Sequence, residues 1–361
     1  MAEKKKILYI VEAMGGGVFT YIVELANALA DTYDMYIAYA VREQTPKDYK
    51  SYFDKRVHLI HVKNFRRAVS PAADVRAFFE IRRIAAQIRP DVIHLHSSKA
   101  GALGRFAFNG NKVPLFYTPH GYSFLMQNTS AVKRSLYRGI EVLCGLRPCT
   151  TISCSVGENT EAKRIARRAV CVDNGIDIPE LQAMLAKGPA PQPHPFTVFT
   201  LGRICYQKNP AQFNRIAQAM PDVRFLWIGD GEDRPLLTAP NIEITGWAAR
   251  EEALRHASAG DVFVLTSLWE GLPIALLEAM YMKKTCAVSD VIGNRDVIRN
   301  GENGFVCTGV DDYVQAIRRA QRDECDAMKE HAYADILNHY NTQVMAQQYS
   351  RIYDEEMRRK A

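Results

Sequence analysis

The chain has 361 residues, of which 47% are hydrophobic and 24% are charged. This length favours two domains, and the composition is too apolar for a disordered protein. The net charge of +6 is uneven: residues 1–177 hold 26 Lys and Arg against 16 Asp and Glu, a balance of +10, and the remainder holds 20 against 24, a balance of −4. A basic half favours an anionic partner, either a nucleic acid or a membrane surface.

Short β-branched segments alternate with longer helical patterns in the first half of the chain. The clearest helical patterns cover 18–31, 71–88 and 98–108. The expected strands are 6–12, 34–40, 57–62, 91–96, 114–119, 149–153 and 169–172. This alternation predicts βαβ units and a parallel sheet that is covered on both faces.

Four prolines interrupt residues 188–196, where no helix can continue, so we predict an interdomain linker over 179–196. The strand pattern then restarts, which predicts a second parallel sheet. Its expected strands are 197–202, 223–229, 241–245, 261–266, 284–289 and 304–307.

The tail is predicted to form one amphipathic helix over 341–361, because Met345, Tyr349 and Tyr353 recur at helical spacing. The expected fold is therefore α/β, with two Rossmann-like parallel-sheet domains over 1–178 and 197–340 that face each other across a cleft. We expect the C-terminal helix to cross back to the N-terminal domain.

No segment contains the roughly 20 consecutive apolar residues that a membrane-spanning helix needs. The first residues are not typical of a signal peptide, because the apolar run 7–11 is too short and poorly flanked. The eight cysteines include no Cys-x-x-Cys pair, which favours a reduced, cytoplasmic compartment.

The most informative motif follows the expected strand 261–266 and runs from Ser267 to Met280. Pro273 is expected near the first position of a helix, whose free N–H groups can bind an anion. Glu270 precedes this helix and Glu278 lies within it, eight residues later. Carboxylates beside a phosphate-binding helix suit a ligand that also presents hydroxyl groups, as a sugar nucleotide does.

This segment resembles the E-x7-E motif of the retaining glycosyltransferases of glycosyltransferase family four, which have the GT-B fold. The resemblance implies that Glu278 binds the ribose hydroxyls and Glu270 those of the transferred sugar. It also implies that Pro273, Ile274 and Ala275 contact the donor. The alternative is a solvated glutamate and a capping glutamate on an ordinary helix.

A second match lies at the end of the expected strand 197–202, where Gly202-Arg203 is followed by Lys208. By resemblance, Arg203 and Lys208 hold the donor diphosphate and neutralise it as it leaves. The chain has no Asp-x-Asp metal motif. We therefore expect no cofactor and no metal requirement; two surface cations near a turn are the alternative.

Further segments resemble the family in places where it approaches the nucleotide base. They contain Gly229, Gly231 and Trp247, although Trp247 could instead pack between helix and sheet. The family's Gly-Gly and Glu are replaced by Gly293-Asn294 and Asp296, which leaves the contacts of that loop open.

In the N-terminal half, a glycine run joins the first strand to the first helix. Its position resembles the family's Gly-Gly loop, which implies that Gly16 and Gly17 face the diphosphate or the acceptor. His120 matches the family's His-Gly position, close to the transferred sugar, although a lone histidine is usually structural. His94 and His96 alternate along a strand, where packing is a better explanation than metal binding.

The resemblance implies transfer of a hexose or N-acetylhexosamine from a nucleotide sugar, with a UDP-sugar favoured, to a hydroxyl acceptor. The acceptor would be a glycan or lipid-linked saccharide in polysaccharide biosynthesis, and the anomeric configuration would be retained. The alternatives are a GT-B sugar-nucleotide epimerase and a non-catalytic nucleotide-sugar-binding protein. A dehydrogenase is disfavoured, because the dinucleotide fingerprint is absent.

Residues 131–147 intersperse cations such as Lys133, Arg134 and Arg138 with aliphatic side chains. A basic amphipathic helix of this kind can lie on an anionic membrane, which would place the protein at the inner face of the plasma membrane. In the alternative, the apolar residues pack on the sheet and the cations are only solvated. Nucleic acid is not expected as a partner, because no recognition motif accompanies the charge.

Overall fold

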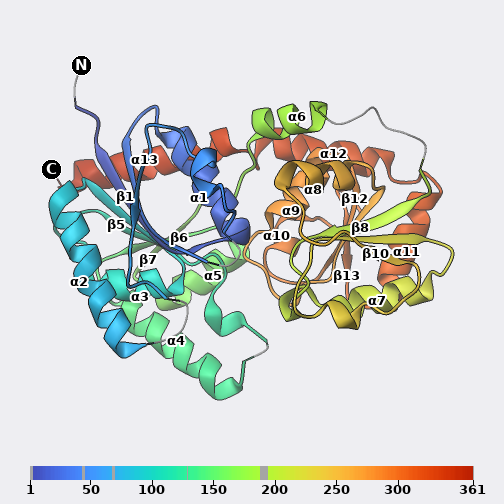
Figure 1. Cartoon of the computed structure of the whole chain (residues 1–361), viewed down its shortest axis with the longest axis horizontal. Helices are drawn as coiled ribbons and strands as arrows, with labels where there is room; N and C mark the ends of the chain where they lie inside the picture. Colours follow the sequence, from blue (N-terminus) through green and yellow to red (C-terminus); the bar gives the residue numbers. More distant parts are fainter. Residues whose placement is uncertain (1–2, 43–44, 67–69, 128, 188–193, 361) are drawn as a thin grey trace. The chain divides into compact units, whose positions relative to one another are not determined.

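A computed structural model describes residues 3–42, 45–66, 70–127, 129–187 and 194–360. They form two compact units, each with one parallel sheet (Figure 1). Unit 1 consists of Met1–Leu125, Thr129–Asn174 and Thr342–Ala361, and unit 2 of Met126–Asn128 and Gly175–Asn341. The predicted α/β fold with two Rossmann-like domains is confirmed.

The sheet of unit 1 has seven parallel strands in the order β3-β2-β1-β4-β5-β6-β7. The strands are β1 (Lys6–Met14), β2 (Asp34–Val41), β3 (His58–His61), β4 (Val92–His96), β5 (Leu115–Thr118), β6 (Thr150–Ser153) and β7 (Arg168–Cys171). The helices are α1 (Gly16–Leu29), α2 (Pro71–Ile88), α3 (Ser98–Ala107), α4 (Ala131–Gly145), α5 (Val156–Ile165) and α13 (Thr342–Lys360). Each expected strand of the first half is found, with shifts of one or two residues at its ends.

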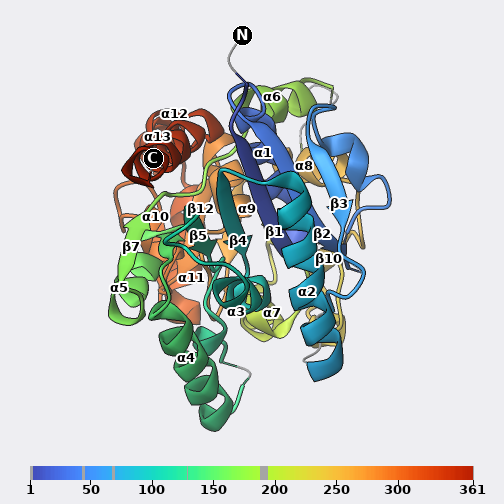
Figure 2. The ribbon, with the colours of Figure 1, turned by 90° about the vertical axis from the view of Figure 1, so that its left-hand side faces the viewer.

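Both faces of this sheet are buried, as expected for a parallel sheet. Along β1, Ile7, Tyr9 and Val11 belong to the core on the side of α1 and α13. Leu8 and Ile10 belong to the core on the side of α2 and α3. Residues 7–11 are therefore all apolar, because alternate side chains enter two different cores. Figure 2 shows β1 within the sheet of unit 1.

Helix α13 packs in unit 1 through a row of tyrosines. Tyr349 and Tyr353 are fully buried, and their hydroxyls lie 2.5 Å from that of Tyr21 and 3.2 Å from that of Tyr9. The predicted return of the C-terminal helix to the N-terminal domain is confirmed. Buried phenols keep hydrogen-bond partners here, so the helix is held by polar as well as apolar contacts.

The sheet of unit 2 has six parallel strands in the order β10-β9-β8-β11-β12-β13. The strands are β8 (Thr197–Leu201), β9 (Arg224–Ile228), β10 (Ile242–Ile244), β11 (Val262–Leu265), β12 (Thr285–Ser289) and β13 (Phe305–Cys307). The helices are α6 (Ile178–Ala186), α7 (Pro210–Ala219), α8 (Arg250–Ser258), α9 (Ile274–Tyr281), α10 (Asn294–Val297), α11 (Val310–Gln321) and α12 (Asp326–Asn338). Because every strand is parallel, the loops that follow the strands gather at one edge of the sheet.

The segment expected as a linker begins with a helix. Asp177 caps α6 by accepting a hydrogen bond from the Glu180 N–H at 2.9 Å, and the helix belongs to unit 2. Residues 188–193, which hold most of the prolines, lie outside the described residues. The chain passes between the units at Asn174–Gly175 and Asn341–Thr342, and also on either side of Met126–Asn128. The expected boundaries were 178 and 341.

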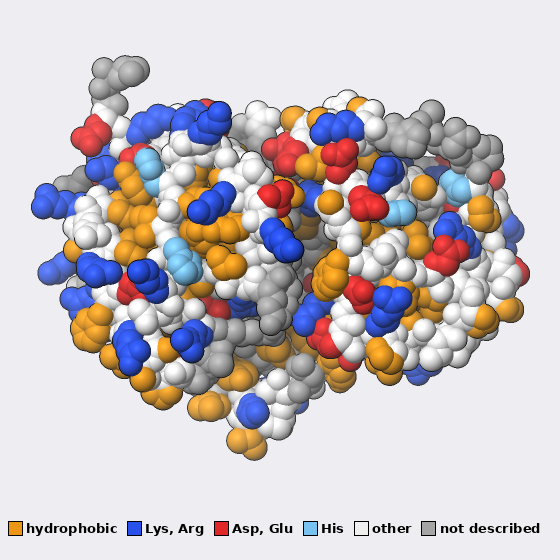
Figure 3. Space-filling view, in the orientation of Figure 1, with side chains coloured by type: hydrophobic (Ala, Val, Ile, Leu, Met, Phe, Trp, Pro, Cys, Tyr) orange, Lys and Arg blue, Asp and Glu red, His pale blue; other side chains and the backbone are white. Residues whose placement is uncertain are grey.

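Among the described residues, no helix is both long and apolar enough to cross a membrane. Lys and Arg side chains (blue) are scattered over the surface of unit 1 in Figure 3.

Candidate functional site

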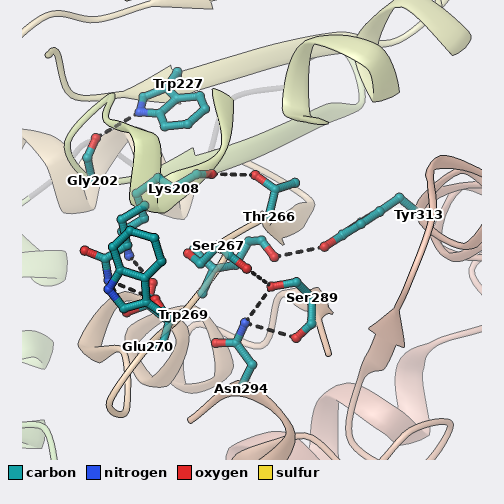
Figure 4. A network of polar contacts seen from close by, with 12 residues as sticks. Gly202, Lys208, Trp227, Thr266, Ser267, Trp269, Glu270, Ser289, Asn294 and Tyr313 are labelled. Atoms are coloured by element: carbon teal, nitrogen blue, oxygen red, sulfur yellow. Dashed lines mark hydrogen bonds and ion pairs between the residues drawn. The ribbon is translucent and has the colours of Figure 1, made fainter. Parts of the chain in front are cut away.

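The site is built from two loops at the carboxyl edge of the unit 2 sheet. One follows β8 and ends in a short turn, Tyr206–Lys208, and the other joins β11 to α9. The Thr266 hydroxyl donates a 2.7 Å hydrogen bond to the Lys208 carbonyl, and the Leu268 N–H donates one of 2.8 Å to the Gln207 carbonyl. These bonds hold the two loops against each other (Figure 4).

Lys208 and Glu270 form an ion pair across these loops. The Lys208 Nζ lies 2.7 Å from the Glu270 Oε1, and both side chains are largely buried. Gln207 donates to the Trp269 carbonyl at 2.9 Å and to the Glu270 Oε2 at 3.4 Å. An ammonium group has three donors, so Lys208 can bind an anion and keep its contact with Glu270.

A third loop supports Glu270 from β12. Gly293 has a φ of +86°, and a Cβ on it would lie 2.4 Å from the Gly271 carbonyl oxygen and 3.2 Å from the Glu270 Cβ. The Asp296 carboxylate accepts the Gly293 N–H at 3.0 Å. Only glycine fits at position 293, and the hydrogen bond to the Asp296 side chain stabilises the turn. This accounts for Gly293 and Asp296 in the loop whose contacts the sequence left open.

Further hydrogen bonds join this loop to the end of β11. The Ser289 hydroxyl donates to the Ser267 carbonyl at 2.5 Å, and the Asn294 Nδ2 donates to the Ser289 hydroxyl at 3.1 Å (Figure 4). Within the described part of the chain, the buried Ser267 Oγ has no hydrogen-bond partner. Ser267 and Ser289 also line a pocket of about 330 Å³ beside the network. The backbone around Glu270 is thus held by a chain of polar contacts.

The N-terminus of α9 can receive an anion. Pro273 is the N-cap, one position earlier than expected, and gives the helix no side-chain cap. The Leu276 and Leu277 N–H groups donate hydrogen bonds to the Pro273 carbonyl, and they are the first N–H groups of α9 that have an acceptor within the helix. The Ile274 and Ala275 N–H groups precede them and have no intrahelical acceptor by helix geometry. Their dipoles favour a negative ligand.

Glu278 lies one turn further along α9 and is fully buried. Its Oε1 is 2.8 Å from the Arg250 Nη1. Burial raises the pKa of the Glu278 carboxyl above its ordinary value, and the neighbouring Arg250 opposes this shift. Sequence reasoning missed Arg250. Arg250 is the first residue of α8, where a cation is unfavourable because it lies at the positive end of the helix dipole. This unfavourable position was the signal in the sequence that Arg250 pairs with a carboxylate.

Arg203 lies apart from this pair. Its Nε and Nη2 are both 2.9 Å from the Oε2 of Glu232, in the loop that follows β9. Both side chains are partly exposed, so water weakens this ion pair. The structure therefore brings Lys208 and Glu270 together but places Arg203 against a different carboxylate.

Gly229 and Gly231 are required by close backbone contacts. A Cβ on Gly229 would lie 2.2 Å from the Gly202 carbonyl oxygen, and one on Gly231 would lie 2.1 Å from the Ile204 carbonyl oxygen. The Trp227 Nε1 donates to the same Gly202 carbonyl at 2.8 Å. These glycines let the ends of β8 and β9 pack together, a role that is independent of any ligand.

Trp247 follows β10 and is 66% exposed. The interpretation that it packs between helix and sheet is therefore wrong. Its side chain lines a second pocket, of about 290 Å³, with residues of β9, β10 and α8. An exposed indole beside a pocket is available to a planar ligand.

In unit 1, Gly16 and Gly17 form the first turn of α1 instead of a loop. Both are exposed, and no described atom lies within 4 Å of where their Cβ would be. Gly16 has a φ of +57°, which glycine adopts without strain. The start of α1 is thus open to a ligand.

His120 follows β5 with a φ of +55°, unusual for a residue other than glycine. Its Nε2 is 3.1 Å from the Nδ1 of the buried His96, and its ring packs edge-on against Tyr21. Burial lowers the pKa of His120 to about 3. His120 is therefore neutral at physiological pH, and its geometry is held by His96.

Two family models match the chain. The model described as Glycosyltransferase Family 4 matches residues 15–180, and the one described as Glycosyl transferases group 1 matches residues 195–323. The two matches do not overlap, and they fall on the N-terminal and C-terminal sheets. Together they span most of the chain.

Curated relatives include glycosyltransferases whose names contain a diphosphoundecaprenol or a phosphatidylinositol. The chain is 28% identical to an Escherichia coli protein named UDP-Gal:alpha-D-GlcNAc-diphosphoundecaprenol alpha-1,3-galactosyltransferase, over 80% of this chain and 82% of that protein. It is 26% identical to a phosphatidyl-myo-inositol mannosyltransferase of Mycobacterium leprae, over 79% of this chain and 78% of that protein.

Solved structures share the fold over nearly the full length. Sucrose-phosphate synthase from Thermosynechococcus elongatus covers 98% of this chain with a TM-score of 0.79 and 16% identity, and 99% of its own chain is covered. Anabaena HepE, solved with UDP and glucose, covers 97% of this chain with a TM-score of 0.74 and 16% identity, and all of its own chain is covered. At these identities the likeness establishes the GT-B fold.

Proposed function

Because the chain belongs to glycosyltransferase family four, we propose that it transfers a hexosyl or N-acetylhexosaminyl group from a UDP-sugar to a hydroxyl group of a lipid-linked saccharide, with retention of configuration. The product would be an intermediate of polysaccharide biosynthesis. The observation that carries this proposal is the Lys208–Glu270 pair, in which Lys208 belongs to the loop after β8 and Glu270 to the loop that leads into the N-terminus of α9.

The donor diphosphate would lie between Lys208 and the first turn of α9. Both are fixed before the ligand arrives, because hydrogen bonds tie the two loops together. As the bond between the anomeric carbon and the β-phosphate breaks, negative charge grows on the phosphate. A fixed cation and the N–H groups of Ile274 and Ala275 stabilise that charge more than they stabilise the ground state. Arg203 would have to leave Glu232 to assist.

The two glutamates would bind the hydroxyl groups on either side of the diphosphate. Glu270 accepts from Lys208 and Gln207 but has further lone pairs for the hydroxyls of the sugar. Its charge also favours the positive, oxocarbenium-like ring of the transition state. Glu278 would accept from the ribose, with Arg250 fixing its rotamer. The leaving phosphate would take the acceptor proton on the same face of the sugar.

The relatives' names support the choice of donor and acceptor. The Escherichia coli relative is named for UDP-galactose and a sugar diphosphoundecaprenol, and a Campylobacter jejuni relative is named for a diphospho-undecaprenol-linked sugar. The Anabaena structure contains UDP. A lipid-linked acceptor would also bring the enzyme to the inner face of the plasma membrane, where we expect it to act as a peripheral protein.

The proposal is tested by release of the nucleoside diphosphate. The protein is incubated with UDP-galactose, UDP-glucose, UDP-N-acetylgalactosamine or GDP-mannose, with and without an undecaprenyl-diphosphate-linked sugar. We expect one UDP-sugar to yield UDP only when the acceptor is present, with one product formed per UDP. Release that does not depend on any acceptor would indicate hydrolysis or epimerisation, and would contradict the proposal.

We also predict that transfer needs no metal ion. The side chain of Lys208 and the dipole of α9 would take the place of the divalent cation that other transferases bind to the diphosphate. Activity in excess EDTA should therefore equal that of untreated protein. If EDTA abolished transfer and Mn²⁺ or Mg²⁺ restored it, the diphosphate would depend on an ion, and this part of the mechanism would be wrong.

A further inference from the structure

Helix α4 of unit 1 carries its apolar side chains on its outer side. Val132, Leu136, Ile140 and Leu143 recur every three or four residues and so form one stripe. Their exposed fractions are 80%, 59%, 40% and 57%. The interpretation that the apolar residues of this segment pack on the sheet does not hold for these four.

The inner side of α4 holds a buried ion pair instead. The Arg105 Nη2 of α3 lies 2.6 Å from the Glu141 Oε2, and the Tyr117 hydroxyl donates to the Glu141 Oε1 at 2.9 Å. The Arg105 guanidinium also lies 4.1 Å from the centre of the Tyr117 ring. Turning α4 to bury its stripe would leave Arg105 buried without its carboxylate, which is strongly unfavourable. The outward direction of the stripe is therefore fixed by this pair.

Cations border the stripe. Lys133 is exposed beside the stripe. Arg138 is exposed further round the helix, with its guanidinium 5.6 Å from the centre of the Phe124 ring, and Arg134 is half-buried. Glu141 is the only acidic residue of α4, and it is buried against Arg105. The outer face of α4 therefore combines long aliphatic side chains with positive charge and no carboxylate.

Helix α2 also exposes apolar and basic side chains, although it carries the partly exposed carboxylates Asp74 and Glu80 as well. Val75 and Phe79 are exposed one turn apart, and Arg76 and Arg82 are exposed near them. Helix α3 packs against both α2 and α4, which flank it on one side of the sheet (Figure 2). In Figure 3, hydrophobic side chains (orange) lie between Lys and Arg (blue) along the lower edge of unit 1, over α4.

We propose that the outer face of α4, with α2 beside it, lies on an anionic lipid bilayer. The apolar stripe would enter the boundary between headgroups and acyl chains, and the bordering cations would lie at the level of the lipid phosphates. The charge pattern favours lipid over a protein partner, because exposed cations accompany the aliphatic stripe in the first half of α4 and the only carboxylate of the helix is buried. Membrane binding by α4 does not depend on the proposed function. Only its role, which is to hold the enzyme beside a lipid-linked acceptor, rests on that function.

The test is co-sedimentation with vesicles of phosphatidylcholine alone or mixed with phosphatidylglycerol. The wild type should sediment with the anionic vesicles at low salt and, more weakly, at physiological salt, where charges are screened over about 8 Å. Lys133→Gln/Arg138→Gln should lose this binding mainly at low salt. Leu136→Gln/Leu143→Gln should weaken vesicle binding by at least about tenfold at both salt concentrations, because the apolar stripe supplies the hydrophobic contribution to binding, which salt does not screen.

Matched control variants show whether a loss of vesicle binding is specific to the α4 face or follows from any change of an exposed side chain. Leu337→Gln, an exposed leucine of α12 in unit 2, and Arg351→Gln, an exposed arginine of α13, should bind vesicles as the wild type does. All variants should unfold at the wild-type temperature, since the changed side chains are exposed. A wild type that stays in the supernatant at both salts, or α4 variants that bind normally, would overturn the inference.

Sedimentation velocity and transfer to a water-soluble acceptor test whether the α4 variants fail for a reason other than lost contact with lipid. If Leu136→Gln/Leu143→Gln dissociated a dimer in sedimentation velocity, the stripe would bind a second copy, and the lipid proposal would be wrong. Transfer to a short water-soluble acceptor should be normal in every α4 variant. A wild type that transfers sugar normally but does not bind vesicles would overturn this inference alone. Absence of transfer from every donor would overturn the proposed function and leave the vesicle result standing.

Discussion

Replacing Lys208 by alanine is expected to lower kcat by about two to three orders of magnitude, the loss typical of a removed charge-stabilising group. Lys208 is the cation that the folded chain places beside Glu270, 2.7 Å from its carboxylate. Without it, the charge that develops on the leaving phosphate would be met by the helix N-terminus and Arg203 alone. Steady-state rates with the preferred UDP-sugar provide the measurement.

Two comparisons make the Lys208→Ala result specific. Lys187→Ala removes an exposed lysine of unit 2 that pairs with Glu251, and should leave kcat unchanged. Lys208→Met keeps the aliphatic bulk and should be as inactive as Lys208→Ala if charge is what matters. Near-normal turnover of Lys208→Met, with unfolding at the wild-type temperature, would remove Lys208 from the donor site.

The two glutamates of the motif should fail in different ways. Glu278→Gln should weaken UDP binding by about 10- to 100-fold, since a hydrogen bond to a charged group is worth about 1.5–3 kcal/mol. Glu270→Gln should not weaken UDP binding, because it releases Lys208 from its carboxylate partner. It should nevertheless lower kcat by about 100-fold or more, because the sugar and its developing positive charge lose their acceptor. Calorimetry with UDP and steady-state rates would separate the two.

Glu251→Gln is the matched control for both glutamates, because Glu251 is an exposed glutamate of unit 2. It should bind UDP and turn over as the wild type does. Equal loss of UDP affinity in Glu270→Gln and Glu278→Gln would contradict the division of roles between them.

The pH dependence of UDP binding should follow Glu278. Because burial raises the pKa of this carboxyl, it takes up a proton at a higher pH than an exposed glutamate does during acidification. The ionised form accepts the ribose hydroxyls, so UDP affinity should be full above the raised pKa and fall as the pH is lowered through it. The Glu278→Gln variant has no such group, and its weaker binding should not show this fall.

Much of the fold is predictable from local patterns. The strands of both sheets are short β-branched runs between helical patterns, and tertiary packing preserves them because both faces of each sheet are buried. The linker prediction over 179–196 missed helix α6, because it rests on the later prolines, whereas Asp177 and Pro179 start a helix before them. The local capping residues could have shown this.

The site was predictable in its parts but not in its pairings. Glu270 and Glu278 share one motif, whereas the Lys208–Glu270 contact joins residues 62 positions apart and depends on how β8 and β11 align. The partners of Arg203 and Glu278, which are Glu232 and Arg250, could not be read from spacing. The outward face of α4 was equally hidden, since it is fixed by the buried Glu141.

The anomeric configuration of the reaction product distinguishes retaining sugar transfer from every alternative. The preferred UDP-sugar, whose sugar is α-linked, is incubated with the lipid-linked acceptor, and the coupling constant of the new anomeric proton is read by NMR. We predict an α-linked disaccharide, formed in equal amount with UDP by the wild type and not by Lys208→Met. A β-linked product, or an altered free sugar released with UDP in the absence of acceptor, would contradict the account.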